Sequence, residues 1–144
     1  MHSVAPMNLA TLRLSGSDAS LDLLVETLGL AVSSRVRAGD PRRGGGVHTS
    51  SGLSAPIADA ESPGALLRDV RVFLAKCHKH GNTIFANGVI AELSFGISVG
   101  DSTQYVASLD FTASELRDLT DIGIGLNFTA YPTSDEVNEV GKVA

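Results

Sequence analysis

Four arginines in one short stretch are the residues of this sequence best suited to binding chemistry. Arg35 and Arg37 are two residues apart, a spacing that puts both side chains on the same face of a strand. Arg42 and Arg43 lie in the adjoining loop. Guanidinium groups gathered in this way can bind an anion or a carboxylate, so the sequence predicts ligand-binding residues Arg35, Arg37, Arg42 and Arg43. The competing interpretation places the first two on the solvent face, paired with acidic side chains of the C-terminal third.

A second candidate surface is acidic. Residues 92–144 carry nine acidic and two basic side chains, whereas residues 1–91 carry seven acidic and nine basic ones. An acidic surface can take the place of phosphate on a basic protein and speeds association with it. We therefore predict partner-binding residues Asp110, Glu115, Asp118 and Asp121, followed by an acidic tail.

Cys77, His78 and His80 are the side chains that could form a nucleophile pair or supply metal ligands. Cys77 continues the apolar face of a predicted helix, whereas His78 is turned about 100° away from it and His80 lies at the helix end. We therefore expect a buried thiol and two helix-end histidines rather than a site. The remaining histidines, His2 and His48, have no zinc-finger spacing, and no metal ligand set is predicted.

Two other patterns are typical of catalysis but have structural explanations. Asp40 and Asp110 could form an acid–base pair, yet Asp40 precedes a proline, as in turns, and Asp110 lies just before a predicted helix start. The triple glycine at residues 44–46 is not followed by the Lys-Ser/Thr of a phosphate-binding loop, and we expect a mobile linker. The sequence predicts no catalytic residue and no cofactor.

Composition limits the classes of function further. The chain has 144 residues, a net charge of -5 and one cysteine. The negative charge argues against a nucleic-acid partner, and a single cysteine cannot form an internal disulfide. We find no signal peptide and no apolar run of the roughly 20 residues that a membrane-spanning helix needs. The expected location is therefore the cytoplasm.

The elements that must position these residues alternate along the chain. Period-2 patterns predict strands at residues 9–14, 30–39, 47–57, 89–99, 104–109 and 126–131. Helical spacing predicts three helices between them. The first is capped by Ser20 and ends at Gly29, the second begins at Ser62-Pro63 and runs to Gly81, and the third is capped by Ser114 and ends at Gly123.

This order predicts an α+β fold. Helices on one face of a mainly antiparallel sheet form a two-layer sandwich, ferredoxin-like or related to it. The first and last strand-helix-strand units are alike, which indicates an internal duplication. We expect one domain at residues 9–131, a flexible N-terminus at residues 1–8 and an acidic tail at residues 132–144.

Three patterns together resemble a known family. The triplet LGL at residues 28–30, the stretch SRVRAGDP at residues 34–41 and the closing pattern over residues 116–131 are similar to the bacterial family catalogued as domain of unknown function 4279. The resemblance covers roughly residues 9–131 and implies this same order of elements. Similar sequences place a tryptophan after the basic loop, where this chain has Val47, His48 and Thr49. The family has no established reaction, so the resemblance implies a fold rather than an activity.

The sequence thus favours a non-enzymatic binding protein. We expect an immunity-type or antitoxin-like inhibitor that acts by protein–protein contact, with a basic toxin domain as its partner and with neither nucleic acid nor a membrane involved. The alternative is a regulatory module that binds a small anionic ligand through the basic strand and loop. A homodimer is compatible with the pattern, because an exposed sheet edge can pair with a second copy.

Overall fold

The computed structural model describes residues 5–136, which form one five-stranded sheet and three helices. The elements are β1 (Asn8–Gly16), α1 (Asp18–Leu28), β2 (Ser34–Val36), β3 (Ser51–Asp59), α2 (Pro63–Lys79), β4 (Ile90–Val99), α3 (Ala113–Ile122) and β5 (Ile124–Pro132). The strand order is β2-β3-β1-β4-β5. All neighbours are antiparallel except β4 and β5, which run parallel. The predicted α+β architecture with a mainly antiparallel sheet is confirmed.

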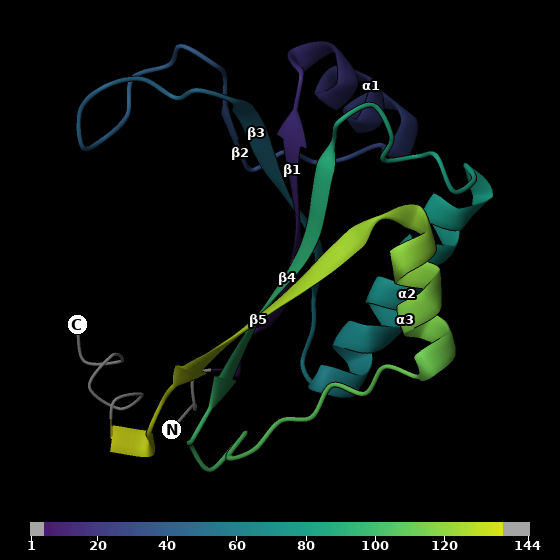
Figure 1. Cartoon of the computed structure of the whole chain (residues 1–144). Coiled ribbons are helices and arrows are strands. Elements are labelled where there is room, and N and C mark those ends of the chain that lie inside the picture. Colours follow the sequence, from purple (N-terminus) through teal and green to yellow (C-terminus); the bar gives the residue numbers. More distant parts are fainter. Residues whose placement is uncertain (1–4, 137–144) are drawn as a thin grey trace.

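All three helices lie on the same face of the sheet (Figure 1). Strand alternation explains which face they cover. In β1, Ala10, Leu12 and Leu14 are buried against the helices, while Arg13 between them is exposed on the other side. Leu93 and Phe95 of β4 continue the buried layer. The hydrophobic core therefore fills the space between the sheet and the helices, and the opposite face of the sheet is left uncovered.

Helix α2 begins and buries its apolar face as the sequence predicts. The Ser62 hydroxyl accepts a hydrogen bond from the Ala65 amide at 3.1 Å, and Pro63 occupies the first turn. Leu66, Val70 and the other apolar residues at helical spacing are buried. The helix ends at Lys79, just before the predicted end.

The caps of the other two helices lie elsewhere than predicted. Ser17 rather than Ser20 caps α1, because its hydroxyl accepts the amide of Ser20 at 3.2 Å. Thr112 rather than Ser114 caps α3, because Thr112 and Glu115 exchange hydrogen bonds in a capping box. Both helices end, as predicted, at a glycine in the left-handed conformation, Gly29 and Gly123 respectively.

Three strand predictions need correction. The strand predicted at residues 30–39 is reduced to β2, because the segment that leaves α1 does not bond to β3 before Ser33. β3 begins at Ser51, later than predicted, because residues 37–50 form a separate loop. Residues 104–109 form no strand. They belong instead to the long crossover that a parallel pair such as β4 and β5 requires.

The two termini are better ordered near the sheet than the predicted boundaries suggest. Asn8 is fully buried at the start of β1, and the Met7 amide donates to the Ser98 hydroxyl at 2.8 Å. At the other end, Pro132 closes β5. Residues 1–4 and 137–144, which hold most of the predicted flexible terminus and acidic tail, lie outside the described residues. The internal duplication stays a prediction. Within residues 5–136, no helix has the length and apolar character to cross a membrane.

Candidate functional site

The uncovered face of the sheet, here called the open face, is built mainly from small polar side chains. Thr11 and Arg13 of β1 lie on it, and Ser94 and Gly96 of β4 extend it. Gly96 leaves room for the ring of Tyr131, since a Cβ at this glycine would lie 3.3 Å from the ring. The face is therefore rich in hydroxyl groups, with one large aromatic side chain toward one end.

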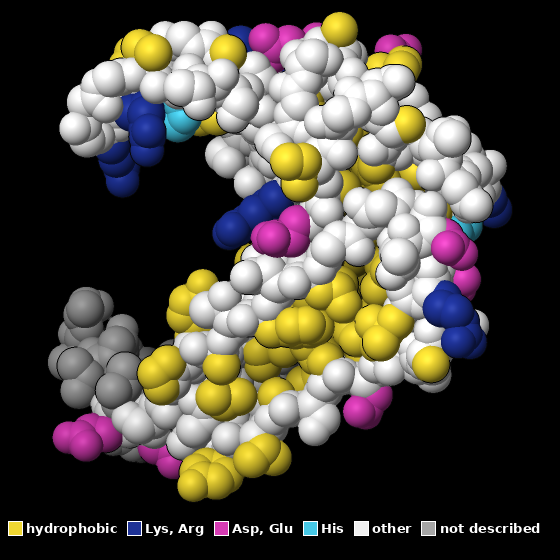
Figure 2. Space-filling model, in the orientation of Figure 1, with side chains coloured by type: hydrophobic (Ala, Val, Ile, Leu, Met, Phe, Trp, Pro, Cys, Tyr) yellow, Lys and Arg dark blue, Asp and Glu magenta, His cyan; other side chains and the backbone are white. Residues whose placement is uncertain are grey.

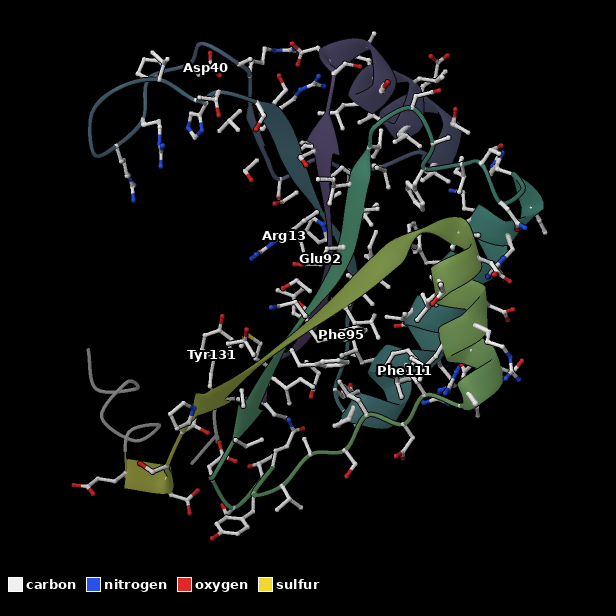
Figure 3. The ribbon with its side chains drawn as sticks, viewed as in Figure 1. Arg13, Asp40, Glu92, Phe95, Phe111 and Tyr131 are labelled. Atoms are coloured by element: carbon white, nitrogen blue, oxygen red, sulfur yellow. The ribbon has the colours of Figure 1, made fainter. Side chains whose placement is uncertain are left out.

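Arg13 is the cation at the centre of the open face. The register of β1 places it between Ser54 of β3 and Glu92 of β4. Figure 3 shows the Arg13 and Glu92 side chains projecting from the sheet on the side away from the helices. No ion pair of Arg13 occurs among residues 5–136. Beside it, a shallow depression of about 240 Å³ is lined in part by Arg13, Ser34, Val36 and Ser54.

Residues 37–50, here called the basic arm, form a hairpin that extends beyond the sheet (Figure 1). Three backbone hydrogen bonds join its two sides. The Gly39 amide donates to the His48 carbonyl at 2.8 Å, and the His48 amide donates to the Asp40 carbonyl at 2.8 Å. Near the tip, the Arg42 amide donates to the Gly46 carbonyl at 3.0 Å. The triple glycine thus forms the tip of a hydrogen-bonded hairpin rather than the mobile linker that the sequence predicts. Asp40 accepts the amide of Arg37 at 2.7 Å, which is the turn role expected for it.

The basic arm overhangs the open face. Figure 2 shows the Lys/Arg and His side chains of the arm turned toward a hollow whose floor holds a further basic and an acidic side chain. The charged side chains labelled in the same region are Arg13 and Glu92 (Figure 3). Arg42 and Arg43 are exposed, and neither forms an ion pair within residues 5–136. His48 is half-buried at the base of the arm.

Arg35 of β2 and Arg37, the residue that follows this strand, point to the same side, as their spacing predicts, and this is the helix side. Arg35 Nη1 lies 2.6 Å from the Asp22 carboxylate and Nη2 lies 3.2 Å from that of Asp18. Arg37 Nη1 is 3.1 Å from the same Asp18 oxygen. The carboxylates therefore come from α1 and not from the C-terminal third. This cluster ties β2 to α1. It divides the predicted arginine set into two residues that form ion pairs and two that form none within residues 5–136.

The charges of this cluster hold one another in the ionised form. A hydrogen bond from the Ser51 hydroxyl and then the guanidinium of Arg35 keep the pKa of the Asp18 carboxyl below its ordinary value. The carboxylate of Asp22, followed by that of Asp18, raises the pKa of Arg35. Arg35 is accordingly a structural cation, and its side chain is only 18% exposed.

The four predicted acidic residues lie on or just before α3, and the structure does not leave them as a uniform acidic surface. The Glu115 carboxylate accepts one hydrogen bond from Nε of Arg71 at 2.7 Å and another from Nη2 of the same residue at 3.3 Å. The carbonyl of Asp110 accepts from the same guanidinium at 3.0 Å. Asp118 borders a depression of about 180 Å³ between α2 and α3, and Asp121 is exposed.

The Glu115 and Arg71 charges are strongly coupled. The Arg71 guanidinium, and then the Thr112 amide, lower the pKa of Glu115 to about 2. In return, the hydrogen bond to Glu115 raises the pKa of Arg71. A basic partner approaching α3 would therefore meet a cation as well as carboxylates.

The cysteine and histidines do not converge. Cys77 is fully buried, and burial raises the pKa of its thiol to about 11. His78 borders the depression between α2 and α3. His80 borders a different one, of about 270 Å³, between α1 and the connection that precedes β4. Within residues 5–136, no three His, Cys, Asp or Glu side chains are grouped as a metal site would require.

Sequence reasoning missed Arg13 as a functional candidate. Its alternation with Leu12 and Leu14 indicates that it lies opposite the buried face. Together with the helix layer predicted on one face, that pattern places Arg13 on the uncovered face. It does not reveal that β1 is the middle strand of the sheet, which is what makes Arg13 central. Comparisons with protein-family models, with curated proteins and with solved structures found no match to this chain. The resemblance to domain of unknown function 4279 therefore stays a prediction.

Proposed function

We propose that this protein is a non-enzymatic binding protein whose working surface is the open face beneath the basic arm. The partner is a protein that presents an acidic surface or segment. The observation that carries the proposal is the overhang of the basic arm, which holds the exposed Arg42 and Arg43, above the open face that holds Arg13. None of the three arginines forms an ion pair among residues 5–136. Cations left without partners around a concave surface attract an opposite charge.

A protein fits this surface better than nucleic acid does. Sheets that bind single strands stack the bases on aromatic side chains, whereas β1 and β4 present Thr11, Ser94 and Gly96 here. Hydroxyl groups and a mixed pair of charges instead suit the polar surface of a protein.

The breadth of the surface favours a macromolecule over a small ligand. Pockets for small ligands are usually enclosed and hold about 300–1,000 Å³. The depression beside Arg13 is shallow and holds about 240 Å³. The open face around it extends over five strands and continues onto the basic arm. The regulatory-module alternative has less support for this reason.

Two further observations support this choice of function and surface. Arg71 partly neutralises the acidic surface on α3, which weakens the prediction that this surface binds a basic toxin domain. The raised pKa of buried Cys77 is the reverse of what a thiol nucleophile needs. An immunity-type or antitoxin-like role stays a prediction, since inhibition is compatible with either surface.

Fluorescence anisotropy with a labelled short polyglutamate peptide tests the proposal. We expect binding at low salt that weakens as salt rises. Arg42→Ala/Arg43→Ala should reduce the affinity about 5- to 30-fold, which corresponds to ~1–2 kcal/mol for two exposed ion pairs. Arg68→Ala/Arg117→Ala is the matched control, because it removes the same charge from the exposed helix side and should change little.

Four results would count against the proposal. Equal losses in the two double variants would mean that only net charge matters. Tighter binding of a single-stranded oligonucleotide than of polyglutamate would favour nucleic acid. If polylysine binds the wild type and this binding is lost in Asp118→Asn/Asp121→Asn, the working surface is the acidic surface on α3. Pyrophosphate binding as tightly as the peptide at the same arginines would favour the small-ligand alternative.

A further inference from the structure

The two edges of the sheet differ in how well they are protected against pairing. β2 has three residues, and its Arg35 is held by α1. β5 has nine residues and carries no charged side chain, and within residues 5–136 it pairs only with β4. Proteins usually protect an edge strand by keeping it short or by placing charges or proline on it. By these criteria β2 is a protected edge, whereas β5 has only a proline at its last residue.

The backbone of β5 has hydrogen-bonding groups directed away from the sheet. The Thr133 amide, just after the strand, donates to the Val99 carbonyl of β4 at 2.7 Å. Because successive residues of a strand point their amides in opposite directions, Leu126, Phe128 and Ala130 present theirs to the free edge. Pro132 falls on the same side, where its missing N–H costs no bond to β4.

An apolar patch lies beside this edge. The Phe128 side chain is 52% exposed, although its ring stacks on Phe95 with centroids 5.1 Å apart. Phe111, from the crossover before α3, meets the same ring edge-on at 6.3 Å. Figure 2 shows hydrophobic side chains gathered across this part of the molecule. An exposed aromatic side chain on a strand edge without a partner is typical of an interface.

We infer that β5 pairs antiparallel with β5 of a second copy of this chain, about a two-fold axis at Phe128. This register is self-complementary. It places Leu126 opposite Ala130 on the helix side and Asn127 opposite Thr129 on the open face. Gly125 comes opposite Tyr131, so the largest side chain meets the smallest. No like charges face each other, because β5 has none.

The consequence is a continuous ten-stranded sheet, since each copy contributes five strands. A two-fold axis perpendicular to the sheet keeps both helix layers on one side. The two open faces then adjoin each other on the other side. The inference is independent of the proposed function, because Arg13, Arg42 and Arg43 are not on β5.

Two charge variants of the full chain test both the pairing and its register. Asn127→Lys/Thr129→Lys places lysine opposite lysine twice across the interface, whereas Asn127→Lys/Thr129→Glu places lysine opposite glutamate twice. Both residues are exposed on the open face, so either variant is expected to fold, and a melting curve by circular dichroism verifies it. Light scattering after size exclusion, over a range of concentrations, gives the mass.

The wild type should approach twice 14.9 kDa as concentration rises. The Lys/Lys variant should weaken dimerisation at least about tenfold, while the Lys/Glu variant should dimerise like the wild type or better. A wild type that is monomeric at every concentration overturns the inference. Dimers of equal strength in all three proteins place the interface elsewhere, and folded monomers of both variants contradict the register.

Discussion

The buried amide pair of Asn8 and Gln104 gives a prediction whose size follows from the structure. Asn8 is fully buried and Gln104 is 7% exposed. Gln104 Nε2 donates to Asn8 Oδ1 at 2.9 Å and to the Ser98 carbonyl at 2.7 Å. Asn8 Nδ2 donates to Gln104 Oε1 at 3.2 Å and to the Ala60 carbonyl at 3.3 Å. The pair therefore fastens the crossover after β4 to the start of β1.

Replacing one amide leaves the other without its partner. Gln104→Met removes the donor to Asn8 Oδ1 and to the Ser98 carbonyl, and the acceptor of one Asn8 N–H. At ~1 kcal/mol or more for each buried group, the free energy of unfolding should fall by about 3 kcal/mol. Asn8→Leu should cost a similar amount. The double variant should cost only about 2 kcal/mol, because the two amides disappear together and only the carbonyls of Ser98 and Ala60 lose donors.

Urea unfolding followed by far-ultraviolet circular dichroism measures these free energies in a chain without tryptophan. The informative quantity is the coupling between the two substitutions rather than either loss alone. If the two losses add to within ~0.5 kcal/mol in the double variant, the amides do not interact in the folded protein, and the reasoning fails.

Three further predictions concern stability and reactivity. The pKa of Glu115 is about 2, below its ordinary value near 4.5, so its stabilising contribution is present above pH 4.5 and is lost as the pH falls toward 2. The free energy of unfolding should therefore decrease over this pH range, and Glu115→Gln should remove this part of the decrease. Cys77 should react with a thiol reagent only at the rate at which the protein opens, so labelling of the native protein as fast as labelling in urea would contradict its burial. Gly100→Ala should destabilise by at least ~2 kcal/mol in a thermal melt, since φ is +106° and a Cβ would lie 2.5 Å from the Thr133 carbonyl oxygen, whereas Gly44→Ala, with nothing within 4 Å, should be near neutral.

The sequence predicts the fold where a local signal is unique. Ser62 followed by proline, and glycine after each apolar helix face, locate the start of α2 and the ends of α1 and α3. Where several hydroxyl residues compete for a cap, the choice depends on spacing. Thr112 and Glu115 form the T-x-x-E pattern of a capping box, a signal in the sequence that outweighs Ser114.

Features that depend on distant contacts are not predictable in the same way. The segment 104–109 has strand-like residues, yet Gln104 is drawn into the buried pair with Asn8, far away in the sequence. Spacing separates the strand pair Arg35 and Arg37 from the loop arginines, but only the position of α1 shows which carboxylates the strand pair meets. The importance of Arg13 likewise depends on the strand order, which makes β1 the middle strand of the sheet.

The most direct measurement of the central claim is the backbone amide NMR spectrum of the protein during titration with a short polyglutamate peptide. The account predicts shifts that concentrate on the strands of the open face around Arg13 and Glu92 and on the basic arm around Arg42 and Arg43. The amides of α3 should stay unchanged. Shifts that concentrate on α3, or that are spread evenly over the surface, would contradict the claim that the open face beneath the basic arm is where this protein binds.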